Sequence, residues 1–134
     1  MNLLRILILE DDLQTQAVLL KHISDLENHL CQEGNPVKLS TTVISEYTQV
    51  EEYINKTSHP FDIILLDRDD KIGGSFHVLD FNKFAKNRII GISSTPPYND
   101  QLRYKGITKI VWKDYSNLEN FAAHVIKNIL LLIT

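Results

Sequence analysis

Acidic side chains follow two strongly apolar runs of the chain, directly after the point where each run ends. Glu10, Asp11 and Asp12 follow the first run, near the N-terminus, and Asp67 follows residues 63–66. Four apolar residues in a row predict a short strand that is buried on both faces, as in a parallel sheet covered by helices. The carboxyl ends of such strands meet at one edge of the sheet, where open α/β folds build their sites. We therefore expect these carboxylates to converge.

Carboxylates that converge at one sheet edge repel one another, and a hard divalent cation resolves that repulsion. Mg²⁺ prefers oxygen ligands, accepts one or two carboxylates and keeps bound waters. The sequence therefore predicts a Mg²⁺ site among the acids that follow these two runs.

A hydroxyl and an amine follow two further apolar runs. Ser93 comes after residues 88–92, and Lys113 comes after residues 109–112. At the same sheet edge they would supply the anion-binding half of a site. Phosphoryl transfer to an aspartate needs a metal ion, a lysine and a hydroxyl around one carboxylate. Asp67 would be the nucleophile, and the product would be an acyl phosphate.

Five runs with strand character alternate with helical patterns along the chain. The expected strands are residues 3–9, 37–43, 63–66, 88–92 and 109–112. Short strands that alternate with helices indicate right-handed crossovers and a parallel sheet with helices on both faces. The predicted fold class is therefore α/β, with a β-α unit repeated five times. The second strand alternates only in part and is β-branched, so we expect it at an edge of the sheet.

Apolar spacing and capping residues predict the helices. Four leucine and isoleucine residues between positions 19 and 30 fall on one helical face, and Asp12 is the expected N-cap of that helix. Ser116 is the expected cap of the last helix, with Glu119 three residues on, as in a capping box. Further helices are expected around residues 47–54, 76–84 and 98–105.

The composition fits a single ordinary domain. The chain has 134 residues, of which 43% are hydrophobic and 23% charged, and its net charge is -3. Its 14 basic residues form no stripe, so neither nucleic acid nor an anionic membrane is an expected partner. The apolar runs are far shorter than the roughly 20 residues that cross a bilayer, and no signal-peptide pattern is present. Cys31 is the only cysteine, which excludes an internal disulfide and fits a reducing, cytoplasmic setting.

Four segments together resemble the response-regulator receiver domain of two-component signalling. They are Leu-Arg-Ile-Leu-Ile-Leu-Glu10-Asp11-Asp12, Phe-Asp-Ile-Ile-Leu-Leu-Asp67, Ile-Ile-Gly-Ile-Ser93-Ser94 and Gly106-Ile-Thr-Lys-Ile-Val-Trp-Lys113. The match runs in order over essentially the whole chain. The resemblance implies a flavodoxin-like receiver fold, a doubly wound (βα)5 arrangement with a five-stranded parallel sheet. We expect residues 1–134 to form one receiver domain, with no output domain after the fifth helix.

The resemblance also implies a role for the acids. Asp67 would be the phosphoacceptor, and Glu10 with Asp11 would position Mg²⁺, with the backbone carbonyl of Asp69 as a further ligand. The phosphoryl group would come from a histidine on a sensor kinase or a phosphotransfer protein. The result would be a signal to a downstream protein partner, and no enzyme activity beyond self-phosphorylation and autodephosphorylation is expected. By their position alone, Asp69 and Asp70 are expected to be solvated loop acids, although a carboxylate at position 69 could instead alter attack by water or crowd the metal.

A second set of residues would convert phosphorylation into movement. In the resemblance, Ser93 takes the place of the switch hydroxyl, and Lys113 pairs with the phosphoryl group. The loop that begins at Ser94 is expected to shift. The aromatic switch position of the family is Ile110 here, and Trp112, two residues on and on the same strand face, is a candidate substitute.

Departures from the family pattern favour an alternative. Lys71 and Asp114 stand where receivers usually have proline, and Ile110 replaces the aromatic residue. These changes favour a pseudo-receiver that keeps the fold and binds proteins without phosphorylation. The intact acids, the hydroxyl and the lysine at the strand ends oppose it.

A third interpretation is a phosphatase. An apolar strand followed by Asp67-Arg68-Asp69 also resembles the first motif of haloacid-dehalogenase-type phosphatases, with the first aspartate as nucleophile. That motif usually opens the fold, whereas two expected strands precede it here.

The last helix ends in residues 129–133, which are apolar on every face of the final turn. One side of this turn belongs to the core. The other side is compatible with a homodimer contact, a partner contact or a truncated linker, and the sequence leaves these open.

Overall fold

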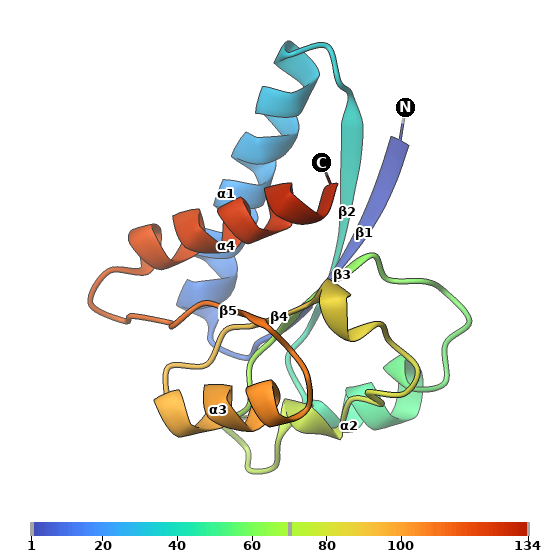
Figure 1. Cartoon of the computed structure of the whole chain (residues 1–134), viewed down its shortest axis with the longest axis vertical. Helices are drawn as coiled ribbons and strands as arrows, with labels where there is room; N and C mark the ends of the chain where they lie inside the picture. The colour runs from blue at the N-terminus through green and yellow to red at the C-terminus, as the bar shows by residue number, and fades with distance from the viewer. Residues whose placement is uncertain (1, 70, 134) are drawn as a thin grey trace.

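The computed structural model describes residues 2–69 and 71–133 and places five strands in one parallel sheet (Figure 1). The strands are β1 (Asn2–Leu9), β2 (Val37–Ile44), β3 (Ile63–Leu66), β4 (Ile89–Gly91) and β5 (Lys109–Ile110). Their order is β2-β1-β3-β4-β5, and every neighbouring pair is parallel. The predicted flavodoxin-like α/β fold is confirmed, and β2 lies at an edge as expected. Asp70, expected to be a loop acid, lies outside the described residues.

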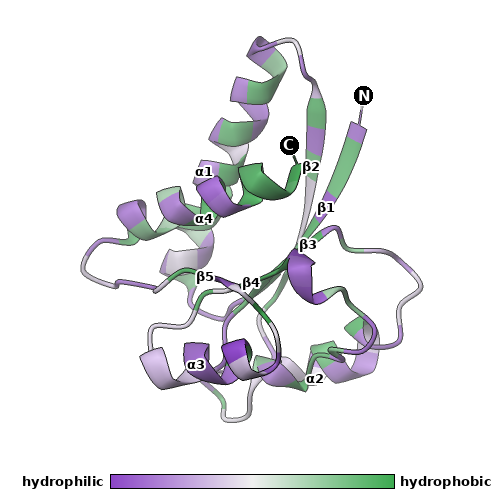
Figure 2. Cartoon of the chain, in the orientation of Figure 1, coloured by the Kyte–Doolittle hydropathy of each residue, from purple (hydrophilic) through white to green (hydrophobic). Residues whose placement is uncertain are grey.

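Helices cover both faces of this sheet. On one face lie α1 (Leu13–Gln32) and α4 (Leu118–Ile133); on the other lie α2 (Tyr47–Gln49), the π-helical turn Val50–Ile54 and α3 (Pro96–Tyr104) (Figure 1). Successive side chains of a strand point to opposite faces, so Ile6 and Ile8 enter the first core and Leu7 and Leu9 enter the second. The strands are therefore apolar throughout at the centre of the sheet (Figure 2). Among residues 2–69 and 71–133, no helix combines the length and the apolar character that a bilayer crossing requires.

The helix predicted around residues 76–84 is wrong. Within residues 71–88 the crossover from β3 to β4 has only short 3₁₀ turns, including Phe76–Val78, and no α-helix. Asn55 provides a physical reason, because its side chain donates to the carbonyl of Val78 (2.9 Å) and accepts from the N–H of Asp80 (2.8 Å). These bonds occupy backbone groups that a helix would pair internally. Phe76, Leu79 and Phe84 are still buried, whereas Val78 is exposed, so the spacing indicated burial for these three side chains but not the backbone conformation.

Of the two predicted helix caps, one is confirmed and one is wrong. Asp12 caps α1, since its side chain accepts from a backbone N–H in the first turn. At α4 the cap is Asn117, whose Oδ1 accepts from the N–H of Asn120 (3.1 Å). The hydroxyl of Ser116 donates instead to Asp114 Oδ1 (2.6 Å). With Ser116 as the cap, the last helix would begin at residue 117; it begins at Leu118 instead.

Candidate functional site

β1 and β3 are neighbours in the sheet and end side by side, which brings two acidic residues together. Leu9 pairs with Leu66 at the strand ends, and the N–H of Asp67 donates to the carbonyl of Leu9 (3.1 Å). Glu10 is fully buried, and Asp67 is 6% exposed. The two acids therefore meet at the carboxyl edge of the sheet, as the strand pattern predicts.

Lys113 places a buried ammonium group between these two carboxylates. Its Nζ lies 3.0 Å from Asp67 Oδ2 and also donates to Glu10 Oε1. The residue is 1% exposed. Its backbone N–H donates to the carbonyl of Ser93 (3.2 Å), which continues the pairing of β4 and β5 past the strand ends. One ammonium group thus faces two carboxylates in a buried site.

Burial and an excess of acid determine the protonation of this site. Burial, followed by repulsion from Asp67, raises the pKa of Glu10 from 4.5 to about 7. Burial also raises the pKa of Asp67, although Lys113 opposes this effect. Burial alone would lower the pKa of Lys113, but attraction to Glu10 and Asp67 outweighs it and raises the pKa. Lys113 therefore stays charged, and the two acids favour a further positive charge nearby.

Asp11 adds a third carboxylate at the partly exposed mouth of the site. One oxygen from each of Glu10, Asp11 and Asp67 lies within 4.8 Å of the other two. The donor atoms are all carboxylate oxygens, and one ammonium cannot balance three acids. This donor set fits a hard divalent cation such as Mg²⁺, which takes oxygen ligands and completes its shell with water. These three residues would hold it.

Ser93 is buried beside Lys113, but its hydroxyl is engaged with its own loop. Oγ accepts from the N–H of Thr95 (3.1 Å). The Ser93 carbonyl accepts from the side chain of Asn99 (3.1 Å) as well as from the N–H of Lys113. The structure therefore links Ser93 to the site through the backbone of Lys113.

The residues considered as support for a switch surround the end of β5. Trp112 is 56% exposed, and its indole N–H donates to the carbonyl of Ser94 (3.0 Å). Ile110 packs against the core beneath α3. Ile110 and Trp112 line one hollow together with Pro96. Trp112 as a substitute for the aromatic switch residue stays a prediction.

The side chain of Asp69 lies apart from the grouped acids. It is exposed and pairs with Arg68 (2.8 Å), whose guanidinium carbon lies 4.0 Å from the ring centre of Tyr98 on α3. A second cation of this loop, Lys71, donates its backbone N–H to Asp11 Oδ2 (2.7 Å). The sequence analysis includes neither Arg68 nor Lys71 among the expected site residues, although both follow Asp67 closely.

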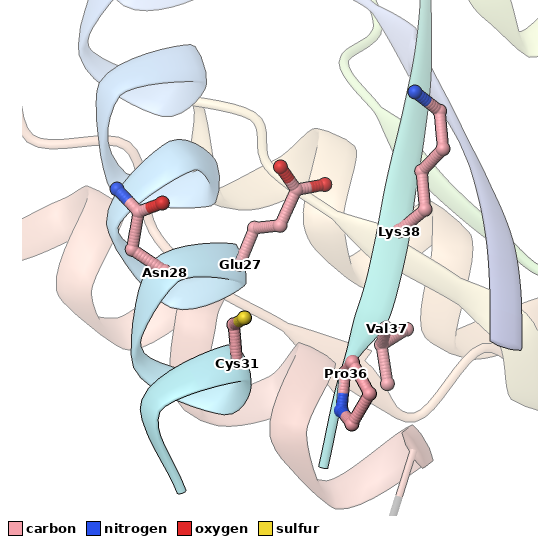
Figure 3. A pocket seen from close by; sticks show the side chains of 6 residues that line it. All are labelled: Glu27, Asn28, Cys31, Pro36, Val37 and Lys38. Atoms are coloured by element: carbon pink, nitrogen blue, oxygen red, sulfur yellow. The ribbon is translucent and has the colours of Figure 1, made fainter. Parts of the chain in front are cut away.

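Another hollow lies between α1 and β2 at the amino end of the strands, away from the acids. It is lined by Glu27, Asn28 and Cys31 of α1 and by Pro36, Val37 and Lys38 at the start of β2 (Figure 3). Glu27 Oε2 accepts from the N–H of Leu39 (2.7 Å) and so covers part of the outer edge of β2. This hydrogen bond covers the outer side of β2 and is remote from the acids. The acids at the carboxyl ends of the strands remain the candidate site.

The sequence matches no protein-family model and no curated protein. Solved structures, however, match nearly the whole chain. The chemotaxis response regulator CheY4 of Vibrio cholerae has a TM-score of 0.63 at 13% identity, covering 98% of this chain and 99% of that one. The receiver domain of HemR from Leptospira biflexa, not phosphorylated, has a TM-score of 0.56 at 18% identity and covers 94% of each chain. The response regulator TrrA of Thermotoga maritima, in complex with Mg²⁺ and BeF, has a TM-score of 0.55 at 20% identity, covering 93% of this chain and 98% of that one.

Proposed function

We propose that this chain, which has the fold of response-regulator receiver domains, accepts a phosphoryl group on Asp67 in a Mg²⁺-dependent phosphorelay. The observation that carries the proposal is the buried group of Glu10, Asp67 and Lys113, in which Lys113 bridges both carboxylates. The phosphoryl donor would be a phosphohistidine of a sensor kinase or a phosphotransfer protein. The chain would act as a signalling module, and its output would be a changed surface.

In this proposal Asp67 is the nucleophile. One of its carboxylate oxygens attacks phosphorus, the P–N bond to the donor imidazole breaks, and the imidazole takes up a proton as it leaves. Lys113, 3.0 Å from Asp67 Oδ2, is placed to neutralise charge on the phosphoryl oxygens. Mg²⁺, when bound, supplies further positive charge there; Glu10, Asp11, Asp67 and the backbone carbonyl of Asp69 are its proposed protein ligands.

The loop after β4 would carry the signal away from Asp67. The Ser93 hydroxyl now accepts a hydrogen bond from the N–H of Thr95. A new phosphoryl group on Asp67 would draw the hydroxyl away from it. The indole N–H of Trp112 donates a hydrogen bond to the carbonyl of Ser94. Movement of this loop would therefore alter the surface that α3, β5 and α4 form. That surface would then shift between two states that a downstream protein partner distinguishes.

A receiver-like module that acts without phosphorylation is the second candidate, and one observation favours it. Lys71 contacts both Asp11 and Asp12, so these acids have a cationic partner within the chain itself. Such a partner suits a fold that works without a metal ion. Mg²⁺-dependent phosphoryl uptake separates the two candidates.

Intact-mass spectrometry after incubation with acetyl phosphate, with and without Mg²⁺, tests the proposal. We expect one added phosphoryl group that requires Mg²⁺ and is lost in Asp67→Asn. Asp69→Asn is the matched control, because it changes a neighbouring acid, keeps the backbone carbonyl and should still be phosphorylated. Uptake by Asp67→Asn would contradict the assignment of the phosphoacceptor. No uptake by the wild-type chain, together with no binding of beryllofluoride, would favour the second candidate.

A further inference from the structure

The loop after β3 folds back onto the acids that follow β1. The backbone N–H of Lys71 donates to Asp11 Oδ2 (2.7 Å), and its ammonium group lies 3.0 Å from Asp12 Oδ1. The loop is closed behind it by the N–H of Phe76, which donates to the carbonyl of Arg68 (2.8 Å). Lys71 is therefore held beside Asp11, at the mouth of the candidate metal site.

Asp12 is a fixed anchor for Lys71. Its Oδ2 accepts from both the N–H and the hydroxyl of Thr15 (2.9 and 2.6 Å) in the first turn of α1. The hydroxyl of Thr15 contributes most to lowering the pKa of Asp12 to about 2, and Lys71 adds to this effect. Asp12 therefore stays ionised and keeps the ammonium group close to Asp11.

Lys71 and a divalent cation would both be attracted to the negative charge of Asp11. The pKa of Lys71 is raised mainly by its hydrogen bond to Asp12, and attraction to Asp11 adds to the rise. A cation held by Glu10, Asp11 and Asp67 would repel this ammonium group. It would also compete with the N–H of Lys71 for the oxygens of Asp11. Coupling between two groups that bind at one site is reciprocal. If the ion displaces Lys71, then Lys71 must weaken the binding of the ion to the same extent.

We propose that Lys71 is a positioning residue that competes with the divalent cation at Asp11, so that Mg²⁺ binds only as the Lys71 contacts give way. The inference rests on the proposed function, because it concerns the ion that phosphoryl transfer to Asp67 would use. Binding of the ion would release Lys71 from Asp12, while α1 keeps its cap through Thr15. The loop after β3 would thereby respond to the metal before any phosphoryl group arrives.

Calorimetric titration of the whole chain with MgCl₂ tests this inference on the wild type and on Lys71→Met. Methionine keeps the backbone N–H and the unbranched side chain but removes the charge. We expect the Mg²⁺ dissociation constant to be at least about threefold lower in Lys71→Met at low salt, with a smaller difference at high salt because exposed charges are screened. Lys71→Arg keeps the charge and should match the wild type. Lys38→Met removes an exposed lysine at the opposite, amino end of the sheet and should also match it.

The outcomes distinguish failure of this inference from failure of the proposed function. Mg²⁺ binding by the wild type with equal or weaker binding by Lys71→Met would overturn the inference alone. Absence of binding in both chains would overturn the inference and the metal-dependent function together. Binding by Lys71→Met alone would support the inference strongly. The Lys71 side chain is 66% exposed, so we expect the variant to fold, and circular dichroism checks this.

Discussion

Replacing Glu10 by glutamine should change how the stability of this protein depends on pH. Glu10 is fully buried, and burial together with Asp67 raises its pKa from 4.5 to about 7. Ionising Glu10 is therefore harder in the folded protein than in the unfolded chain. Each tenfold change in proton affinity corresponds to about 1.4 kcal/mol, so ionised Glu10 lowers the unfolding free energy at pH 8 by roughly 3 kcal/mol.

The sign of this effect follows from the direction of the pKa change. Because the folded pKa lies above the unfolded value, the stability that neutral Glu10 contributes is present below pH 4.5 and is lost as the pH rises through about 7. Glutamine does not ionise, so Glu10→Gln should lack this loss. Glutamine has a single oxygen, whereas Glu10 accepts from Lys113 and, through Oε2, from the N–H of Asp12 (3.1 Å). The change of stability with pH, and not the stability at one pH, is therefore diagnostic.

Urea unfolding followed by circular dichroism, in a chelating buffer between about pH 5 and about pH 8, measures this change. We expect the wild type to lose most of the roughly 3 kcal/mol over this range, and Glu10→Gln to lose much less. Glu52→Gln is the matched control, because Glu52 is exposed and should follow the wild type. Equal pH dependence in the wild type and Glu10→Gln would show that ionisation of Glu10 does not cause the loss of stability.

Two further variants test the charge balance and the helix cap. Lys113→Met leaves Glu10 and Asp67 without their ammonium partner and should lower the unfolding free energy by about 3–5 kcal/mol near pH 8. Both acids take up protons more readily without Lys113, so the loss should shrink toward pH 6, and a loss independent of pH would contradict this account. Asn117→Ala should cost about 1 kcal/mol in urea unfolding because α4 loses its cap. Ser116→Ala should stay within about 0.5 kcal/mol, and equal losses at the two positions would disprove the cap assignment.

The ends of β1 and β3 and the acids that follow them could be predicted because both depend on local patterns, whereas β5 ends at Ile110, two residues before its expected end. Residues 63–66 are apolar without interruption, which a strand buried on both faces requires, and the end of the run marks the edge of the sheet. Glu10, Asp67 and Lys113 each follow such a run. Parallel strands end at a common edge, so the meeting of these side chains could be inferred before any contact between them was seen.

Segments where distant polar side chains bind the backbone could not be predicted in this way. Apolar spacing around residues 76–84 fits a helix, but Asn55, far earlier in the chain, bonds to the carbonyl of Val78 and the N–H of Asp80. The cap of α4 depends on which of two adjacent polar residues, Ser116 or Asn117, faces the backbone N–H groups of the first turn. Both have side chains that can cap a helix, and only the folded geometry distinguishes them.

The contact between Lys71 and Asp11 could not be predicted from the sequence. Lys71 is one of the departures from the receiver pattern that the sequence resembles, and nothing local relates it to Asp11, which lies 60 positions earlier. Periodic patterns determine which residues form buried strands, because burial repeats with the geometry of the backbone. A hydrogen bond between a loop and a distant carboxylate has no period and depends on the path of the folded chain. Local patterns therefore predict the sheet and the grouping of Glu10, Asp67 and Lys113, whereas the position of Lys71 at the mouth of their site depends on the folded path of the loop.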